Sequence, residues 1–470
     1  MASKAFCIHG HFYQPPREDP LTAEIPLEPG AAPYRNWNER IHAQCYRPNA
    51  ELGNFEKISF NIGPTLFQWM EDYDPLTVSR IVTEERRNYA KYGVGNAMAQ
   101  AYNHAILPLA SYQDKLTQVK WGIADFEHRF GHKPLGLWLP ETAVNDETLE
   151  VLVDCGIQFT ILAPWQADTD NVDFSQPYWV SLPQGRKIAT FFYDQALSTR
   201  ISFDPGATVD ADRFVWETLM PEFRMSTRQL NIPQMILIAS DGELYGHHQP
   251  FRDKFLAYLM DGAVSNQPIE KTFPALWLKQ NPPRQHIMVR SNTSWSCHHG
   301  VTRWEGACSC TPNSGWKAPL RNALNYLASL LDQQYLETIG PFLPADPWQL
   351  RHEYIHVILG EIKFEDLIGS VIGKRLDETE EHKIRLLLAA QYERQRMFTS
   401  CGWFFDDFDR IEPRNNVAYA AQAVWLTKLA TGVDLTQPAI NHLHQVKSWR
   451  SGLHADVAFV HHMLRARNSQ

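Results

Sequence analysis

The chain has 470 residues, 44% of them hydrophobic and 12% aromatic, which is enough to fill a barrel-sized domain and a smaller second domain. Its formal net charge of −9 excludes the positive surface that nucleic acids and anionic membranes select, so we expect neither partner. The first residues lack the apolar segment of a signal peptide and no apolar run is long enough to span a membrane, so we expect a cytoplasmic protein.

Short apolar runs in the first half of the chain predict strands that alternate with helices. The strands are expected at 5–9, 57–62, 134–139, 158–162, 188–193 and 234–239. Apolar residues at helical spacing predict helices between them, for example at 114–130 and 147–155. This alternation indicates a parallel sheet with right-handed crossovers. Because polar residues follow several strands, these side chains are expected to converge on one face of an α/β barrel.

From about residue 315 onward the pattern changes to amphipathic helices without convincing strands. We predict helices at 317–334, 348–359, 378–399, 416–430, 439–446 and 456–467. The only Pro-rich patch near the boundary is residues 280–284, and residues 292–317 are too rich in Trp, Cys and His to be a spacer. The sequence therefore predicts an α/β barrel domain at 1–290 and an α-helical domain at 291–470 that packs onto it.

Two carboxylates stand at the ends of predicted strands. Glu141 follows the run 134–139, and Asp241 follows the run 234–239. Taken alone, each is a common cap or turn residue. Two carboxylic acids at strand ends of one barrel are, however, the arrangement that cleaves glycosidic bonds, so we favour catalysis. The fifteen Trp and seventeen Tyr agree with this hypothesis, because aromatic faces stack on neutral sugar rings.

The first predicted strand ends in two histidines, His9 and His11. A metal-dependent hydrolase or deacetylase would use them as ligands together with later residues such as Asp241 and His247. The aromatic residues and the amide of Gln14 that follow them favour contacts with sugar hydroxyls instead. We therefore expect no catalytic metal and no cofactor, and keep the metal-dependent hydrolase as the alternative.

Residues 292–316 combine tryptophans with Cys297, Cys308, Cys310 and two neighbouring histidines. Three cysteines and a histidine can bind zinc, but a single Cys-x-Cys pair is not the usual arrangement of two cysteine pairs. We interpret this segment as a structural loop that bears aromatic residues, and we expect any metal there to be enclosed by four ligands.

Five short motifs, in chain order, resemble the five regions of glycoside hydrolase family 57. They are His-Gly-His-Phe-Tyr-Gln-Pro at 9–15, Asn-His-Ala-Ile-Leu-Pro at 103–108, Trp-Leu-Pro-Glu at 138–141, Asp-Gly-Glu-Leu-Tyr-Gly-His at 241–247 and Gly-Trp-Phe-Phe at 402–405. The resemblance implies a (β/α)7 incomplete TIM-like barrel, followed by a helical domain that completes the active-site cleft. It also implies a retaining enzyme of the amylase, 4-α-glucanotransferase or branching type, acting on an α-glucan or malto-oligosaccharide. The inserted Phe-Tyr pair of the first motif places the chain in a less characterised branch.

Residue by residue, the resemblance assigns Glu141 as the nucleophile and Asp241 as the general acid/base. Asp241 must then hold a proton near neutral pH, which requires that its apolar surroundings, Glu243 or the charge on Glu141 raise its pKa. A retaining mechanism also predicts carboxylates roughly 5–5.5 Å apart. Together with the acidic and aromatic run at 403–407, the motifs predict substrate contacts at His9, His11, Gln14, His104, Trp138, Glu243, His247, Trp403 and Asp406.

Overall fold

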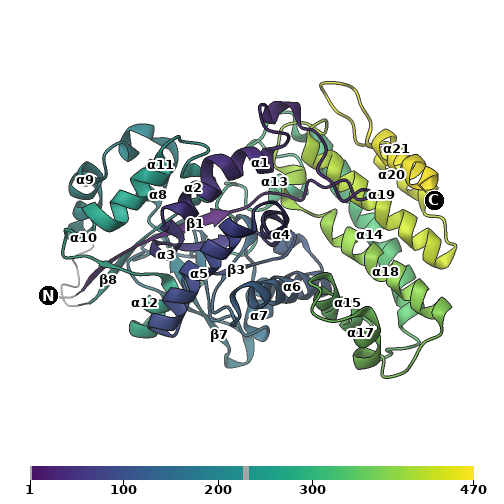
Figure 1. The fold of residues 1–470 in the computed structure, drawn as a ribbon, viewed down its shortest axis with the longest axis horizontal. Coiled ribbons are helices and arrows are strands. Elements are labelled where there is room, and N and C mark those ends of the chain that lie inside the picture. Colours follow the sequence, from purple (N-terminus) through teal and green to yellow (C-terminus); the bar gives the residue numbers. More distant parts are fainter. Residues whose placement is uncertain (1–2, 226–231, 470) are drawn as a thin grey trace. The chain divides into compact units, whose positions relative to one another are not determined.

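The computed structural model describes residues 3–225 and 232–469, which form two compact units (Figure 1). Unit 1 comprises residues 1–14, 27–101 and 126–295, and unit 2 comprises residues 15–26, 102–125 and 296–470. Residues 15–26 and 102–125, which the sequence places in the barrel domain, thus belong to unit 2.

Unit 1 contains a set of parallel strands in the order β8-β1-β2-β3-β4-β5-β7. Strand β1 pairs with both β2 and β8 and, at its beginning, with the short β9. Single parallel bridges, Phe60 with Ala97 and Gly136 with Phe159, connect β2 to β3 and β4 to β5. The Asp194 N–H donates to the Leu237 carbonyl at 2.7 Å and so joins the end of β7 to β8. The strands are β1 (Lys4–Phe12), β2 (Ser59–Ile62), β3 (Ala99–Gln100), β4 (Leu137–Trp138), β5 (Phe159–Leu162), β7 (Lys187–Phe192), β8 (Gln234–Asp241) and β9 (Glu270–Lys271).

The predicted α/β fold class is confirmed, and all six predicted strands are present. The structure adds β3 and β9, together with β6 (Tyr178–Ser181), which runs antiparallel to β7, and β10 (His286–Ile287), which pairs with β6. Eight of the nine residues of β1 are buried, as expected for a parallel strand that is covered on both faces.

One apolar cluster fills the interior enclosed by these strands. Cys7 of β1, Ile161 of β5, Phe191 of β7 and Leu237 of β8 are buried within it, together with Trp277. Because side chains alternate between the two faces of a strand, one shared cluster means that four strands direct one face towards a common interior, as in a barrel.

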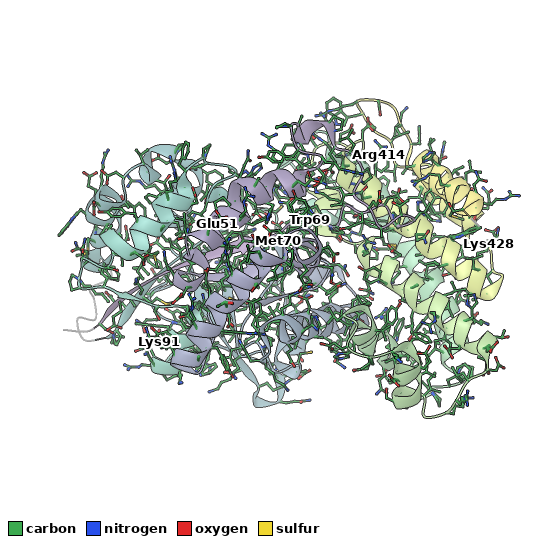
Figure 2. All side chains as sticks on the ribbon, viewed as in Figure 1. Glu51, Trp69, Met70, Lys91, Arg414 and Lys428 are labelled. Atoms are coloured by element: carbon green, nitrogen blue, oxygen red, sulfur yellow. The ribbon has the colours of Figure 1, made fainter. Side chains whose placement is uncertain are left out.

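Helices cover the outside of the strands in unit 1. The predicted helix at 147–155 is found as α7, which begins after Asn145, whose side chain accepts a hydrogen bond from the Thr148 N–H at 2.9 Å. Met70 of α4, labelled in Figure 2, is fully buried. The helices are α1 (Trp37–Ile41), α2 (Arg47–Glu51), α3 (Asn54–Lys57), α4 (Pro64–Tyr73), α5 (Pro75–Tyr92), α7 (Asp146–Asp154), α8 (Gln195–Phe203), α9 (Ala211–Arg213), α10 (Met220–Met225), α11 (Arg252–Tyr258) and α12 (Pro274–Gln280).

Unit 2 consists mainly of helices, and every helix predicted after residue 315 is found. The expected helix at 348–359 is divided into α15 and α16 at Tyr354. Helix α18 begins with a capping box of Asp377 and Glu380. Lys428 near the end of α19, labelled in Figure 2, pairs with Asp434. The helices are α13 (Thr302–Glu305), α14 (Lys317–Ile339), α15 (Gln349–Glu353), α16 (Ile355–Ile358), α17 (Phe364–Val371), α18 (Glu378–Arg396), α19 (Ile411–Thr431), α20 (Thr436–Leu443) and α21 (Ala455–Asn468), with the first part of α6 (Tyr112–Phe130).

No helix within the described ranges is both long and apolar enough to cross a membrane.

Candidate active site

A row of polar side chains crosses the carboxyl ends of neighbouring strands in unit 1. The strand register places Asp241 of β8 beside His11 of β1, and His11 beside Asn61 of β2. The Asn61 Nδ2 donates to the Gln100 Oε1 of β3 at 2.6 Å and so extends the row. Polar strand ends therefore converge at one face, as the sequence predicts.

The two histidines of the first motif are held by buried hydrogen bonds. His9 contacts the Ser59 Oγ through Nδ1 at 2.9 Å and the Asn61 Oδ1 through Nε2 at 3.1 Å. The His11 Nδ1 lies 3.2 Å from the same Asn61 oxygen. Burial lowers the pKa of His9 to about 3 and that of His11 to about 4, so both rings are neutral at pH 7.

The metal-dependent alternative gains no support from this arrangement. Among the described residues, His9, His11 and Asp241 are not one of the groups whose ligand atoms lie close enough together to hold a metal ion. The imidazoles of His9 and His11 are neutral at pH 7. Neutral rings of this kind suit contacts with uncharged hydroxyl groups.

Trp138 lies beneath the two histidines. Its ring stacks on His9 at a centroid distance of 4.6 Å and on His11 at 5.2 Å, and it meets Trp295 edge-on at 5.1 Å. Trp138 is fully buried. Trp138, which the sequence predicts as a substrate contact, therefore packs against the two imidazoles and has no exposed ring face.

Glu141 has an unusual backbone conformation. Its φ of 56° and ψ of 22° lie in the left-handed region, and the following Thr142 also has a positive φ, 48°. Such non-glycine residues cost about 1–3 kcal/mol each and persist where neighbouring contacts hold them. The Gln166 side chain supplies two such contacts, accepting from the Thr142 hydroxyl at 2.8 Å and donating to the Thr142 carbonyl at 2.8 Å.

Trp295 holds Glu141 by two further hydrogen bonds. Its indole Nε1–H donates to the Glu141 Oε2 at 3.0 Å, and its backbone N–H donates to the Glu141 carbonyl at 3.0 Å. The Glu141 side chain is only partly buried, so the carboxylate is positioned and yet still reachable. A positioned carboxylate of this kind is suited to act as a nucleophile.

Asp241 is the last residue of β8, and its side chain is exposed to solvent. The dense protein surroundings nevertheless remove much of its hydration and, with the charge on Glu141 as the second cause, raise its pKa to about 7. Glu141, and not Glu243, is thus the charged neighbour that acts on Asp241. The negative charge of Asp241 in turn adds to the effect of burial in raising the pKa of Tyr193.

Glu243 faces inward. Its Oε1 accepts hydrogen bonds from the Tyr13 N–H at 2.9 Å and from the Tyr46 hydroxyl at 2.7 Å. Burial, opposed by the Tyr46 hydrogen bond and assisted by Asp241, raises the Glu243 pKa to about 8, so this group is mostly protonated at pH 7.

His247 and Gln14 lie at the edges of the same region. The His247 Nδ1 lies 2.7 Å from the Gln44 Oε1, and burial lowers the His247 pKa to about 4. Gln14 is half-buried, and its backbone carbonyl accepts from the Thr65 hydroxyl at 3.2 Å. Glu243 and His247 therefore tie the 241–247 segment to residues 42–46.

Three predicted substrate contacts belong to unit 2. His104, with a positive φ of 54°, contacts the Ser400 Oγ through Nδ1 at 2.6 Å, which joins the second motif to the residues just before the fifth. Trp403 is fully buried, and the Arg321 guanidinium lies 3.8 Å from the centroid of its ring. Asp406 pairs with Arg410 at 3.1 Å and also with Arg450. The third and fourth motifs and all of the first motif except Pro15 thus lie in unit 1, and the second and fifth motifs lie in unit 2.

Sequence reasoning missed several residues of the site. Asn61 had a usable signal, because it is a polar residue near the end of the strand predicted at 57–62, but the sequence does not assign it to the site. The register pairs it with His11. Trp295 and Tyr46 had none, since they reach Glu141 and Glu243 across 154 and 197 residues of chain. The sequence identifies Trp295 only as one of the tryptophans of the loop at 292–316.

Comparison with known proteins adds family information. A family model described as glycosyl hydrolase family 57 matches residues 9–290, and a second, described as a domain of unknown function (DUF3536), matches residues 313–458. A 4-alpha-glucanotransferase of Thermococcus litoralis is 22% identical over 257 residues, which cover 52% of this chain and 36% of that protein. An alpha-amylase of Pyrococcus horikoshii is 22% identical over 256 residues, which cover 52% of this chain and 38% of that protein. The matched region thus spans little more than a third of the length of these relatives.

Solved structures share the fold across nearly the whole chain. An exo-type maltose-forming amylase from Pyrococcus sp. ST04 superposes with a TM-score of 0.75 at 16% identity, covering 97% of this chain and 88% of that one. A family 57 branching enzyme from Pyrococcus horikoshii gives a TM-score of 0.64 at 14% identity and covers 97% of each chain. At these identities the likeness shows the fold alone. Because the family model matches more than half of its residues, this chain belongs to glycosyl hydrolase family 57.

Proposed function

We propose that the chain is a retaining enzyme that hydrolyses or transfers α-glucan chains, with Glu141 as the nucleophile and Asp241 as the general acid/base. The observation that carries the proposal is the coupling of the two carboxyl groups. Asp241 has a pKa near 7, partly because of the charge on Glu141, while Trp295 holds Glu141 by its carboxylate. Two carboxyl groups with different protonation states in one site supply the acid and the nucleophile of glycosidic bond cleavage.

In the first step the Glu141 carboxylate attacks the anomeric carbon of the sugar. The bond between this carbon and the bridging oxygen breaks, and the Asp241 proton passes to the departing oxygen. A covalent glycosyl ester on Glu141 and an ionised Asp241 result. The loss of the negative charge on Glu141 removes one of the two causes of the high Asp241 pKa, which prepares Asp241 to act as a base.

In the second step Asp241 takes the proton of an incoming hydroxyl group, whose oxygen bonds to the anomeric carbon and displaces Glu141. Water as the acceptor gives hydrolysis, and a sugar hydroxyl gives transfer. The names of the relatives include both an alpha-amylase and a 4-alpha-glucanotransferase, so we propose an α-glucan or malto-oligosaccharide as the substrate.

We propose that neutral side chains contact the sugar in unit 1. His11 lies beside Asp241 in the strand register and carries an uncharged ring at pH 7, and Gln14 is half-buried nearby in the chain. Trp138 and Trp403 are fully buried, so we propose that they act through the residues that they support.

A mechanism-based label tests the proposal directly. A fluorinated α-maltosyl fluoride forms a glycosyl-enzyme that breaks down slowly, so peptide mass spectrometry should find one maltosyl group on Glu141. The unlabelled enzyme, given maltoheptaose and then amylose, should produce new chain lengths that show the ratio of hydrolysis to transfer. A label on any other carboxylate, or a labelled Glu141→Gln variant, would contradict the assignment.

A further inference from the structure

Four potential metal ligands meet at one point in unit 2. The Cys297 Sγ lies 3.6 Å from the Cys308 Sγ and 3.9 Å from the Cys310 Sγ. The His299 Nδ1 lies 3.3 Å from the Cys308 Sγ and 3.4 Å from the Cys310 Sγ. All four ligand atoms lie within 4.8 Å of one another.

These separations fit a tetrahedral ion. With Zn–S bonds of about 2.3 Å and a Zn–N bond of about 2.0–2.1 Å, a tetrahedral zinc ion separates its ligand atoms by roughly 3.5–3.8 Å. A disulfide would instead join two of the sulfur atoms at about 2.0 Å and leave the third cysteine unused. All three cysteines are free thiols in the structure. Three thiols and one imidazole around a common centre are a ligand set that suits zinc.

The surrounding residues hold the ligands in this arrangement. Backbone N–H groups of His299 and Arg303 donate to the Cys297 sulfur, and that of His298 donates to the Cys310 sulfur. The other ring nitrogen of His299, Nε2, lies 3.4 Å from the Ser309 hydroxyl. Such contacts stabilise thiolate charge and orient a metal-binding imidazole.

A buried positive charge stands next to the four ligands. Lys317, the first residue of α14, is fully buried, and its Nζ has no hydrogen-bond partner among the residues that the structure describes. All three cysteines are its electrostatic neighbours. Three thiolates and one Zn²⁺ carry a net charge of −1, which a neighbouring ammonium group balances.

We propose that Cys297, His299, Cys308 and Cys310 bind one zinc ion in a closed structural site. The sequence favoured a loop without metal, because only one Cys-x-Cys pair is present. The fold supplies the second half of the ligand set as Cys-x-His, with a turn at Gly300 (φ 76°) between the two pairs. Four protein ligands leave no open position, so the ion fixes the segment that leads into α14 and takes no part in glycosidic chemistry.

Metal analysis of the full-length protein tests the proposal. We expect one zinc per chain in protein purified without chelators, and an X-ray absorption spectrum with three sulfur atoms at about 2.3 Å and one nitrogen at about 2.0–2.1 Å. A wild-type protein that contains no zinc and takes up none from added Zn²⁺ would overturn the proposal. A disulfide between two of the three cysteines, or stoichiometric iron in place of zinc, would also overturn it.

Matched variants test the individual ligands. Cys310→Ser and His299→Ala should lose the zinc, whereas His298→Ala, at the position next to His299, and Cys401→Ser, at a cysteine outside the ligand set, should keep it. Replacement of zinc by Co²⁺ should give wild type the strong visible absorption of tetrahedral thiolate cobalt, a readout that does not depend on any variant folding. Equal zinc loss in the His298→Ala and His299→Ala proteins would contradict the assigned imidazole.

Discussion

Glu141 combines a left-handed backbone with a side chain that Trp295 holds through the carboxylate. Because the side chain is only partly buried, Glu141→Gln should leave the fold intact. Loss of the nucleophile should lower kcat/KM on malto-oligosaccharides at least about a thousandfold, or about 4 kcal/mol in the barrier. Steady-state kinetics check the loss, and circular dichroism checks the fold. Activity within about tenfold of wild type would exclude Glu141 as the nucleophile.

Azide separates the two proposed roles. In a Glu141→Ala protein given α-maltosyl fluoride, azide should occupy the space of the missing carboxylate and yield the β-maltosyl azide. In an Asp241→Ala protein the covalent intermediate still forms, so azide should yield the α-maltosyl azide. The configuration of each product, determined by NMR, assigns the roles independently of the size of the rate loss. The reverse pattern of products would exchange the roles of the two residues.

The proposed role of Asp241 as the general acid predicts that the reaction depends on pH. Its pKa of about 7 means that kcat/KM should decline above about pH 7, as the general acid loses its proton. Asp241→Asn should abolish this limb of the profile and lose more activity on amylose than on α-maltosyl fluoride, whose leaving group needs little protonation. A wild-type alkaline limb that persists in Asp241→Asn would assign the general acid to another residue.

The raised pKa of Asp241 makes the stability of the fold depend on pH. The folded protein holds the Asp241 proton more tightly than the unfolded chain does, so ionisation of this group destabilises the fold increasingly between about pH 4 and pH 7. The melting temperature of Asp241→Asn, relative to wild type, should therefore rise between pH 4 and pH 8. Scanning calorimetry at both pH values measures this difference, and a constant difference would contradict the shift.

At the scale of elements, α6, α14, α15 and α18 are joined by buried charges. Asp114 of α6 lies 3.2 Å from Arg351 of α15 and 2.9 Å from Arg394 of α18, and Arg394 also pairs with Asp332 of α14 at 2.7 Å. Burial opposes the charge on Asp114, but the two arginines outweigh it and lower its pKa to about 2. This network therefore needs every member to remain charged.

Removing one member should be costly. Asp114→Asn leaves two buried guanidinium groups with less compensation, so we expect a loss of about 3–5 kcal/mol in unfolding free energy at pH 7. The exposed pair of Glu365 and Arg385 offers a control, because Glu365→Gln should cost at most about 1 kcal/mol. Because the folded pKa of Asp114 is the lower one, the contribution of its charge is complete above about pH 4 and is lost as the pH falls through about 2, so the difference between the variant and wild type should shrink over this range. Urea unfolding followed by tryptophan fluorescence compares the three proteins, and equal losses in the two variants would contradict the network.

Local patterns account for most of the elements. The helix expected at 114–130 is α6, and the strand expected at 158–162 is β5, because periodic burial is encoded in a few consecutive residues. Strand β3 has only two residues, Ala99 and Gln100, so no periodicity exists to reveal it. The break at Tyr354 was also hidden, since the apolar spacing continues through it.

At the scale of the whole molecule, contacts between distant segments limit what the sequence predicts. Residues 15–26 join unit 2, where the Tyr419 hydroxyl donates to the Pro16 carbonyl at 2.9 Å and Arg396 pairs with Glu18 at 3.0 Å. These contacts join residues about 400 positions apart, and no local pattern indicates them. That Glu141 acts electrostatically on Asp241 could be predicted, because a barrel brings strand ends together whatever the loops do. The contact of Trp295 with Glu141, 154 residues away in the chain, could not be predicted in this way.

The stereochemical course tests the whole reaction. If Glu141 attacks directly and Asp241 then activates water, two displacements occur and an α-linked substrate should first release the α-anomer. Proton NMR of maltoheptaose cleavage, recorded before mutarotation, distinguishes the anomers. The two carboxyl groups in a substrate complex should then lie roughly 5–5.5 Å apart, because a single displacement by water needs roughly 6.5–9.5 Å between them. Prompt release of the β-anomer would mean one displacement, and Glu141 would then be a base that activates water, with no covalent intermediate.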